Sequence, residues 1–143
     1  MGDEMKVNIK KLNKNAVIPK YESAGAAGMD LTATSKTYDE HGNVVYGTGL
    51  AFEIPEGYVG YIFPRSSNAK KDLLLSNSVG VIDSDYRGEV IFKFKPIDTT
   101  YERYDIGDRI GQIIIMPYPK IEFVEVDELD KTERGNGGFG STG

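Results

Sequence analysis

The sequence contains no cysteine, and only one of its 143 residues is a histidine. Without cysteine, disulfides and thiolate metal sites are excluded. The single histidine, His41, lies in the turn-like segment EHGN at 40–43 and has no motif around it. We therefore expect a solvated turn residue there, and neither a Ser–His–Asp triad nor a zinc site.

Positive charge and long apolar runs are also scarce. The chain has 17 Lys and Arg against 22 Asp and Glu, a formal net charge of −5, and no large basic block. Nucleic-acid binding, which depends on neutralising phosphates, is not expected. No segment has the length and hydrophobicity of a signal peptide or a membrane span. We expect a soluble, cytoplasmic protein in which local cations or a metal ion attract any anionic ligand.

Helical periodicity is nearly absent, and the dominant period is two. Val90, Phe92 and Phe94 alternate with Lys93 and Lys95, which predicts a strand with one buried face. Similar alternation occurs at the segments VNIK (7–10), VGYIFP (59–64) and IEFVEV (121–126).

Longer patterns predict how these strands are arranged. RIGQIIIMP at 109–117 is a continuous apolar run typical of a strand buried on both faces. The segments 49–55 and 56–64 resemble the two arms of a hairpin, and 66–72 is the one plausible helical turn, with a serine as its cap. We predict an all-β, jelly-roll-like single domain over residues 1–133, followed by a C-terminal arm at 134–143.

Two stretches carry residues suited to binding anions and cations. In AGMDL, Asp30 is either a turn carboxylate or a group that orients water on a hard cation. In PRSSNAKK, the side chain of Arg65 and the hydroxyls of Ser66 and Ser67 suit a phosphate, although such a turn also serves simply as a helix cap.

Two further stretches combine acidic or amide groups with apolar residues. In VIDSDYRG, Asp83 and Asp85 would project to the same side of an extended chain, as a base with its support or as metal ligands. The alternative is a turn closed by Gly88. In GDRIGQ, Gln112 is an amide within an apolar run and needs a partner, such as a phosphate or water.

The last ten residues, RGNGGFGSTG, are half glycine yet include a cation, an aromatic ring and two hydroxyls. Such a segment buries too little apolar surface to order itself. We therefore expect it to become ordered around a bound ligand as a lid.

Taken in order, these five stretches resemble the five motifs of the homotrimeric dUTPases (deoxyuridine triphosphate nucleotidohydrolases), over residues 24–143. AGMDL is similar to the first motif, PRSSNA to the second, NSVGVIDSDYRG to the third, GDRIGQ to the fourth and RGNGGFGSTG to the fifth. The resemblance implies a distorted jelly-roll-like β barrel, a homotrimer with shared sites, and Mg²⁺-dependent hydrolysis of dUTP to dUMP and pyrophosphate. That activity limits uracil in DNA and supplies dUMP for dTTP synthesis.

The resemblance also implies residue roles. Asp83 would activate the attacking water, and Asp30 would hold Mg²⁺ through water. The other implied residues bind substrate: uracil by Asn77, Val81, Ile82 and Phe139, deoxyribose by Tyr86, the α- and β-phosphates by Arg65, Ser66, Ser67 and Gln112, and the γ-phosphate end by Arg134, Gly140, Ser141 and Thr142.

Three residues depart from the family pattern. The usual second motif has Gly and then an apolar residue where this chain has Ser67 and Asn68, and the usual fourth motif has Ala in place of Gly111. PRSS also resembles the related dCTP deaminases, but Lys93 stands where those enzymes carry a glutamate. A regulatory protein that uses the same scaffold to contact other proteins is the remaining alternative, with residues 34–49 as its only available insertion.

Overall fold

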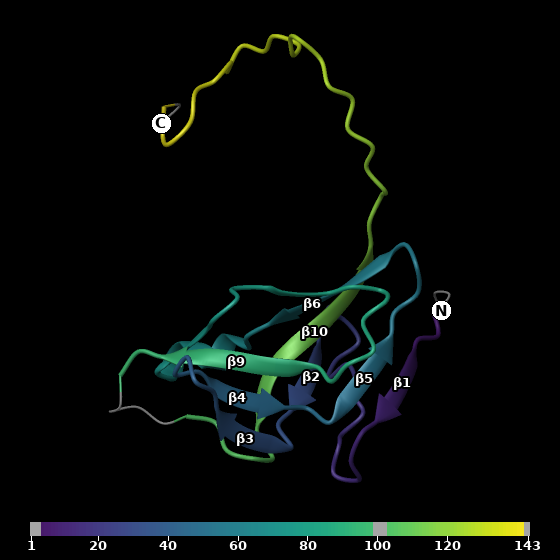
Figure 1. The fold of residues 1–143 in the computed structure, drawn as a ribbon, viewed down its shortest axis with the longest axis vertical. Helices are drawn as coiled ribbons and strands as arrows, with labels where there is room; N and C mark the ends of the chain where they lie inside the picture. The colour runs from purple at the N-terminus through teal and green to yellow at the C-terminus, as the bar shows by residue number, and fades with distance from the viewer. Residues whose placement is uncertain (1–3, 99–102, 142–143) are drawn as a thin grey trace.

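The computed structural model describes residues 4–98 and 103–141 (Figure 1). Within them the chain forms ten short strands and one 3₁₀ helix, η1. These are β1 (Asn8–Lys11), β2 (Met29–Thr32), β3 (Ser35–Tyr38), β4 (Val44–Gly47), β5 (Leu50–Glu53), β6 (Tyr58–Phe63), η1 (Ser66–Lys70), β7 (Leu73–Leu75), β8 (Gly80–Ile82), β9 (Ile91–Pro96) and β10 (Arg109–Pro117). The predicted all-β single domain with one short helix is confirmed.

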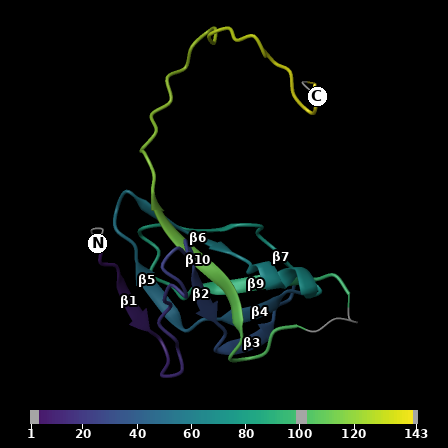
Figure 2. The same ribbon diagram turned by 180° about the vertical axis from the view of Figure 1, so that it is seen from behind.

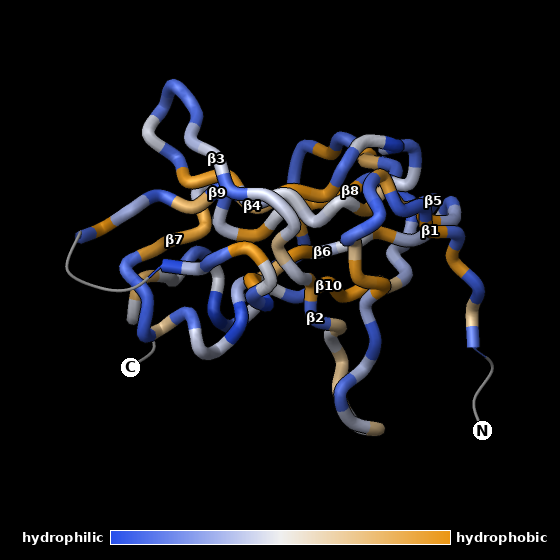
Figure 3. Tube along the Cα trace, turned by 90° about the horizontal axis from the view of Figure 1, so that it is seen from below, coloured by the Kyte–Doolittle hydropathy of each residue, from blue (hydrophilic) through white to orange (hydrophobic). Residues whose placement is uncertain are grey.

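The strands form two four-stranded antiparallel sheets and one strand pair. One sheet has the order β2-β10-β6-β8, the other β3-β4-β9-β7, and β1 pairs with β5. This is the jelly-roll-like arrangement predicted, although hydrogen bonding within the described residues does not close it into one continuous barrel. In Figure 3 the hydrophobic stretches follow the strands and the hydrophilic ones the outer loops.

The core shows why the period-two pattern holds. Phe92 and Phe94 of β9 are fully buried, whereas Lys95 is exposed, as the alternation predicts. Tyr46 of β4 packs edge-on against Phe94, with ring centroids 5.8 Å apart. Burial raises the pKa of Tyr46 to about 12, against a smaller opposing effect of the hydrogen bond that its hydroxyl donates to the Tyr104 carbonyl.

Several local predictions are wrong, three of them within the segments 49–72 and 109–117. Strands β5 and β6 do not pair, because β5 pairs with β1 while β6 lies between β10 and β8. The turn between β5 and β6, closed by the amide of Tyr58 on the carbonyl of Pro55, is a corner between sheets. The N-cap of η1 is Arg65, with no side-chain cap hydrogen bond. Strand β10 buries Ile110 and Ile113 but leaves its last residues exposed.

The chain leaves the folded body after β10. Figures 1 and 2 show the C-terminal segment, green to yellow, arching away from the sheets. Residues 121–126 form no strand, since no free strand edge of the body lies beside them, and Phe123 and Leu129 are 93% and 85% exposed. No helix in the part of the chain described here is both long and apolar enough to span a membrane.

Candidate functional site

Strands β2, β6 and β10 bring three of the predicted site residues together. Gln112 of β10 lies opposite Asp30 of β2 on one side and Phe63 of β6 on the other. Arg65, two residues beyond β6, places its Nε atom 3.3 Å from Oδ1 of Asp30. The first, second and fourth motifs therefore meet in one cluster, which we call the Asp30 cluster (Asp30, Arg65 and Gln112).

Two neighbours that sequence reasoning missed complete the Asp30 cluster. Arg109 Nη1 lies 3.3 Å from Oδ2 of Asp30, so two guanidinium groups flank this carboxylate. A Cβ atom on Gly28 would come within 2.5 Å of Oε1 of Gln112. Only glycine leaves room for this amide, whose Nε2 donates a hydrogen bond of 3.0 Å to the Pro64 carbonyl. In the sequence, the glycine two residues before Asp30 is the one feature that could have indicated this close contact.

The turn that follows β6 presents a cation and two hydroxyls. Arg65 Nη1 donates to Oγ of Ser67 over 3.4 Å, and the neighbouring Ser66 is exposed. These groups are the donors that a phosphate oxygen accepts. We call residues 65–67 the phosphate turn.

The segment from Asn77 to Ile91 forms a small pocket. Its volume is about 120 Å³, and its lining includes Asn77, Val81, Ile82 and Tyr86. The Tyr86 hydroxyl donates to the Glu89 carbonyl over 2.8 Å. The ring lies over Gly88, where a Cβ atom would come 2.5 Å from that hydroxyl. Four of the five residues assigned to uracil and deoxyribose thus line one pocket, which we call the hairpin pocket, and Phe139 is not among its lining residues.

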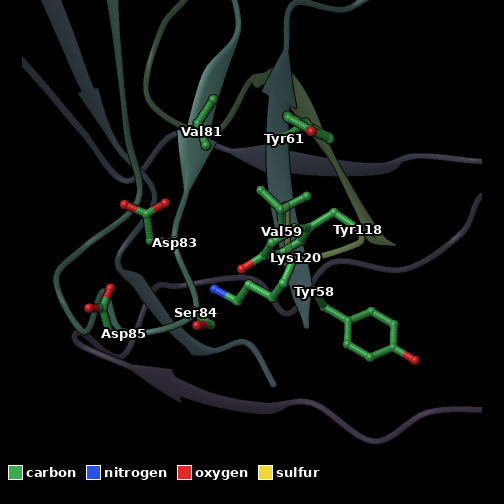
Figure 4. A pocket seen from close by; sticks show the side chains of 9 residues that line it. All are labelled: Tyr58, Val59, Tyr61, Val81, Asp83, Ser84, Asp85, Tyr118 and Lys120. Carbon is green, nitrogen blue, oxygen red and sulfur yellow. The ribbon is translucent and has the colours of Figure 1, made fainter. Parts of the chain in front are cut away.

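Asp83 lies just past the end of β8, beside a larger, open pocket. That pocket, of about 470 Å³, is lined by Asp83 and Asp85 together with Tyr118 and Lys120, which follow β10 (Figure 4). The chain is not extended at the two aspartates, because the Tyr86 amide donates to the Asp83 carbonyl and closes a turn. Both carboxylates are exposed and face the same pocket.

The Asp30 cluster and Asp83 lie at opposite ends of β6. Ile82 pairs with Gly60, so Asp83 comes beside the start of β6, whereas Arg65 follows its end. At about 3.3 Å per residue, the five residues from Gly60 to Arg65 span roughly 17 Å. One chain therefore does not bring Asp83 and Arg65 to the same phosphate.

The described residues of the C-terminal arm, 134–141, lie away from both groups of residues (Figures 1 and 2). Arg134 Nε donates to the Gly137 carbonyl over 2.8 Å, and the Ser141 amide donates to the Gly138 carbonyl. Phe139 is fully exposed, with φ +53°, a conformation uncommon for a residue other than glycine. Gly140 follows at φ +85°. Thr142 lies outside the described residues.

The donor set for a cation consists of one carboxylate. In the two described ranges no three His, Cys, Asp or Glu side chains gather into a group that could hold a metal ion. Asp30 stands beside the phosphate turn, so the residues fit an ion whose inner ligands come mainly from a bound triphosphate.

Comparison with known proteins places this geometry in a family. The family model described as dUTPase matches residues 14–143. The deoxyuridine 5'-triphosphate nucleotidohydrolase of Nautilia profundicola is 48% identical over 97% of this chain and 99% of that protein. The one of Hydrogenobaculum sp. is 42% identical over 97% of this chain and 99% of its own.

Solved structures agree with the sequence comparison. The dUTPase of Staphylococcus bacteriophage 80alpha, a mutant with dUpNHpp, has a TM-score of 0.83 and 27% identity, covering 96% of this chain and 98% of the phage chain. The structure of a mutant dUTPase from phage phi11 of S. aureus, described as showing the coordination of a structural Mg(II) ion, has a TM-score of 0.73. At 24% identity, that last likeness bears on the fold alone.

Proposed function

The chain belongs to the dUTPase family of dUTP diphosphatases, and on that premise we propose that a water activated by Asp83 attacks the α-phosphorus of dUTP. The new bond joins the water oxygen to the α-phosphorus, and the bond from that phosphorus to the oxygen bridging to the β-phosphorus breaks. Pyrophosphate leaves with the bonding electrons, and dUMP remains. The carboxylate of Asp83 accepts the proton of the water.

The hairpin pocket supplies the base and sugar specificity in this proposal. Its small volume and its lining by Asn77 and the backbone of β8 suit a pyrimidine held by amide and carbonyl groups. Cytosine presents the opposite donor and acceptor pattern at its exocyclic group and is rejected. The Tyr86 ring, fixed by its hydrogen bond to Glu89, lies under the deoxyribose and leaves no room for a 2′-hydroxyl.

The phosphate turn and Gln112 bind the α- and β-phosphates. Two guanidinium groups and the neighbouring hydroxyls supply phosphate donors at this end of the molecule, although the carboxylates of Asp30 and Glu22 offset the charge of the two arginines. Mg²⁺ bound with the triphosphate would neutralise part of the substrate's charge. Asp30 would hold that ion through its water ligands.

The separation of these groups supports a homotrimer with shared sites. Asp83 and Arg65 must reach one nucleotide, and about 17 Å of β6 lies between their positions in a single chain. The exposed apolar residues of 118–133 also require cover. We assign the Asp30 cluster and the phosphate turn to one subunit, the hairpin pocket and Asp83 to a second, and the arm to a third.

The arm closes the site in this scheme. Its glycines let backbone amides approach the γ-phosphate, beside Arg134, Gly140, Ser141 and Thr142. Phe139, fully exposed in the single chain, stacks on the uracil. The domain boundary at 133/134 remains a prediction, and so do the cytoplasmic location and the supply of dUMP for dTTP synthesis.

Pyrophosphate release from dUTP, dCTP, dTTP and UTP, each with and without Mg²⁺, tests the proposal. We expect turnover of dUTP that depends on Mg²⁺, and little turnover of the other three. Efficient cleavage of UTP or dCTP would contradict the role of the hairpin pocket, and ammonia release from dCTP would identify a deaminase instead. A molecular mass in light scattering equal to that of one chain would contradict the proposal that the sites are shared between subunits.

A further inference from the structure

The two departures in the second motif converge on one buried side chain. Ser67 and Asn68 replace the glycine and the apolar residue of the usual motif. The Tyr104 hydroxyl donates to Oδ1 of Asn68 over 2.8 Å. Burial raises the pKa of Tyr104, whereas the charge of Arg65 and a hydrogen bond with Ser67 act in the opposite direction. A tyrosine 36 residues further along the chain thus lies beneath the phosphate turn.

Asn68 ties together the segment that begins at Arg65. Its backbone amide donates to the Arg65 carbonyl over 2.9 Å, and its carbonyl accepts from Lys71 over 3.0 Å. Its side-chain Nδ2 donates to the Leu73 carbonyl over 2.9 Å. With the Tyr104 hydroxyl on Oδ1, the Asn68 side chain is held from two directions and its backbone fixes both ends of η1.

Tyr104 is itself rigidly placed. Only 3% of it is exposed, and its carbonyl accepts the Tyr46 hydroxyl over 2.9 Å. Its ring packs edge-on against Tyr46, with centroids 5.9 Å apart, and Nζ of Lys71 lies 5.1 Å from its centroid. The tyrosine therefore couples the phosphate turn to the core of the opposite sheet.

A second contact joins the same two segments. Nε of Arg103 lies 3.5 Å from Oδ1 of Asp72, whose side chain is fully buried. Asp72 immediately precedes β7, and Arg103 immediately precedes Tyr104. The residues after η1 and those around Tyr104 are therefore linked twice.

From this geometry we infer that Tyr104 is a positioning residue, which holds Arg65 and Ser67 in place for the phosphates of the substrate by fixing Asn68. The inference rests on the proposed function, since it requires that the phosphate turn bind dUTP. If the Tyr104–Asn68 hydrogen bond served stability alone, its removal would lower the melting temperature without changing how the folded protein binds phosphate.

Tyr104→Phe removes the hydroxyl and keeps the ring. The loss of one positioning hydrogen bond should raise KM for dUTP and weaken binding of the non-hydrolysable analogue dUpNHpp by about three- to tenfold. Deoxyuridine, which has no phosphate, should bind to Tyr104→Phe as tightly as it binds to the unchanged protein. Tyr38→Phe, at a tyrosine that is 64% exposed, is the control and should change neither affinity.

A double-mutant cycle distinguishes positioning from general damage. Asn68→Leu leaves the Tyr104 hydroxyl without its acceptor and should also weaken dUpNHpp binding. Combined with Tyr104→Phe, it replaces a polar pair by an apolar pair, and part of the affinity should return because the tyrosine hydroxyl is no longer left unpaired. The Leu73 carbonyl loses its donor from Asn68 in the single and the double variant alike. If Tyr104→Phe does not fold, Asn68→Ala gives the same comparison between dUpNHpp and deoxyuridine.

The outcomes separate the two proposals. A wild-type protein that releases no pyrophosphate from dUTP would overturn the proposed function. An active wild type with unchanged KM and dUpNHpp affinity in Tyr104→Phe, or with strictly additive effects in the cycle, would overturn the positioning role alone. Equal weakening of dUpNHpp and deoxyuridine would show general damage, and would also overturn it.

Discussion

Gln112 faces Asp30 across the β10–β2 pair, and its side-chain amide occupies the space that a Cβ atom on Gly28 would take. The position of this amide therefore depends on a residue that belongs to a different motif. The contact joins the first motif to the fourth, and it makes a substitution at Gly28 a way to move Gln112 without changing it.

Gly28→Ala should raise KM for dUTP by about tenfold while the protein stays folded. The added methyl group displaces the end of the flexible Gln112 side chain. The Gln112 amide then loses its hydrogen bond to a charged phosphate group. Steady-state kinetics with dUTP measures the effect. Gly25→Ala is the matched control, since nothing lies within 4 Å of a Cβ atom there. An unchanged KM in Gly28→Ala would remove Gln112 from the phosphate site.

Asp83→Asn should keep dUTP binding and reduce kcat by about 10²- to 10⁴-fold, because the amide cannot accept the proton of the attacking water. The residue is exposed, so stability should not change. Equilibrium binding of dUpNHpp and pyrophosphate release measure the two halves of the prediction. Asp85→Asn, in the same pocket, is the comparison, and it should retain most of the turnover. Turnover near that of the wild type in Asp83→Asn would rule out Asp83 as the base.

Deletion of residues 134–143 should leave folding and trimer formation intact and nearly abolish hydrolysis. The described residues of this segment extend away from the folded body (Figures 1 and 2), so its removal should not disturb the packing of the sheets. Phe139→Ala should weaken dUpNHpp binding by an amount typical of losing one base–aromatic stack, about 1–3 kcal/mol, and Phe139→Tyr should retain it. Calorimetric titration with dUpNHpp measures the binding free energy of the two Phe139 variants. A fully active variant that lacks residues 134–143 would exclude the arm from the site.

Gly111→Ala restores the residue usual in the family, yet it should destabilise this protein by about 1–3 kcal/mol through overpacking. A Cβ atom at Gly111 would overlap the Phe92 ring and come 2.8 Å from the Phe63 carbonyl. Phe92 is fully buried, and the carbonyl belongs to the neighbouring strand β6. Chemical denaturation measures the change. Combination with Phe92→Leu should recover part of it, and a gain in stability would show that the ring moves freely.

Asp39→Asn should lower the melting temperature at pH 7, and the difference from the wild type should shrink below about pH 4. Hydrogen bonds from the side chain and then the backbone amide of Asn43 hold the pKa of Asp39 well below its ordinary value of 3.8. A carboxylate with a lowered folded-state pKa stabilises fully above the unfolded-state pKa and loses that effect as the pH falls through the folded-state value. Thermal melts from pH 2 to 7 test this. Glu40→Gln is the control, since its side chain is 86% exposed.

Sequence patterning predicted the parts of the fold that depend on one strand at a time. The alternation around Phe92 and Phe94 identified a buried face because a strand must turn one face to the core. It did not reveal that β5 and β6 belong to different sheets, since a turn sequence between two strands is compatible with a hairpin and with a corner. Segment 121–126 has a strand-like sequence but no partner edge beside it, and no single-strand pattern contains that information.

The candidate site divides in the same way. Motif order supplied a hypothesis about which residues act, and the sheet register explains why Asp30, Arg65 and Gln112 meet. The distance between Asp83 and Arg65 depends on which strands pair, so the motifs alone could not give it. The departures at Ser67 and Asn68 had no rationale in the sequence, because their partner, Tyr104, becomes a neighbour only when the two sheets pack.

The arm that extends away from the folded body has a genetic consequence if the proposed sites are shared between chains. If Asp83 and the arm of any one site come from different chains, a chain with Asp83→Asn and a chain lacking residues 134–143 carry complementary defects. Two alleles, each inactive when expressed alone, should then restore dUTP hydrolysis when they are co-expressed and assemble together. Complementation between these two variants would show that Asp83 and the arm of one site come from different chains.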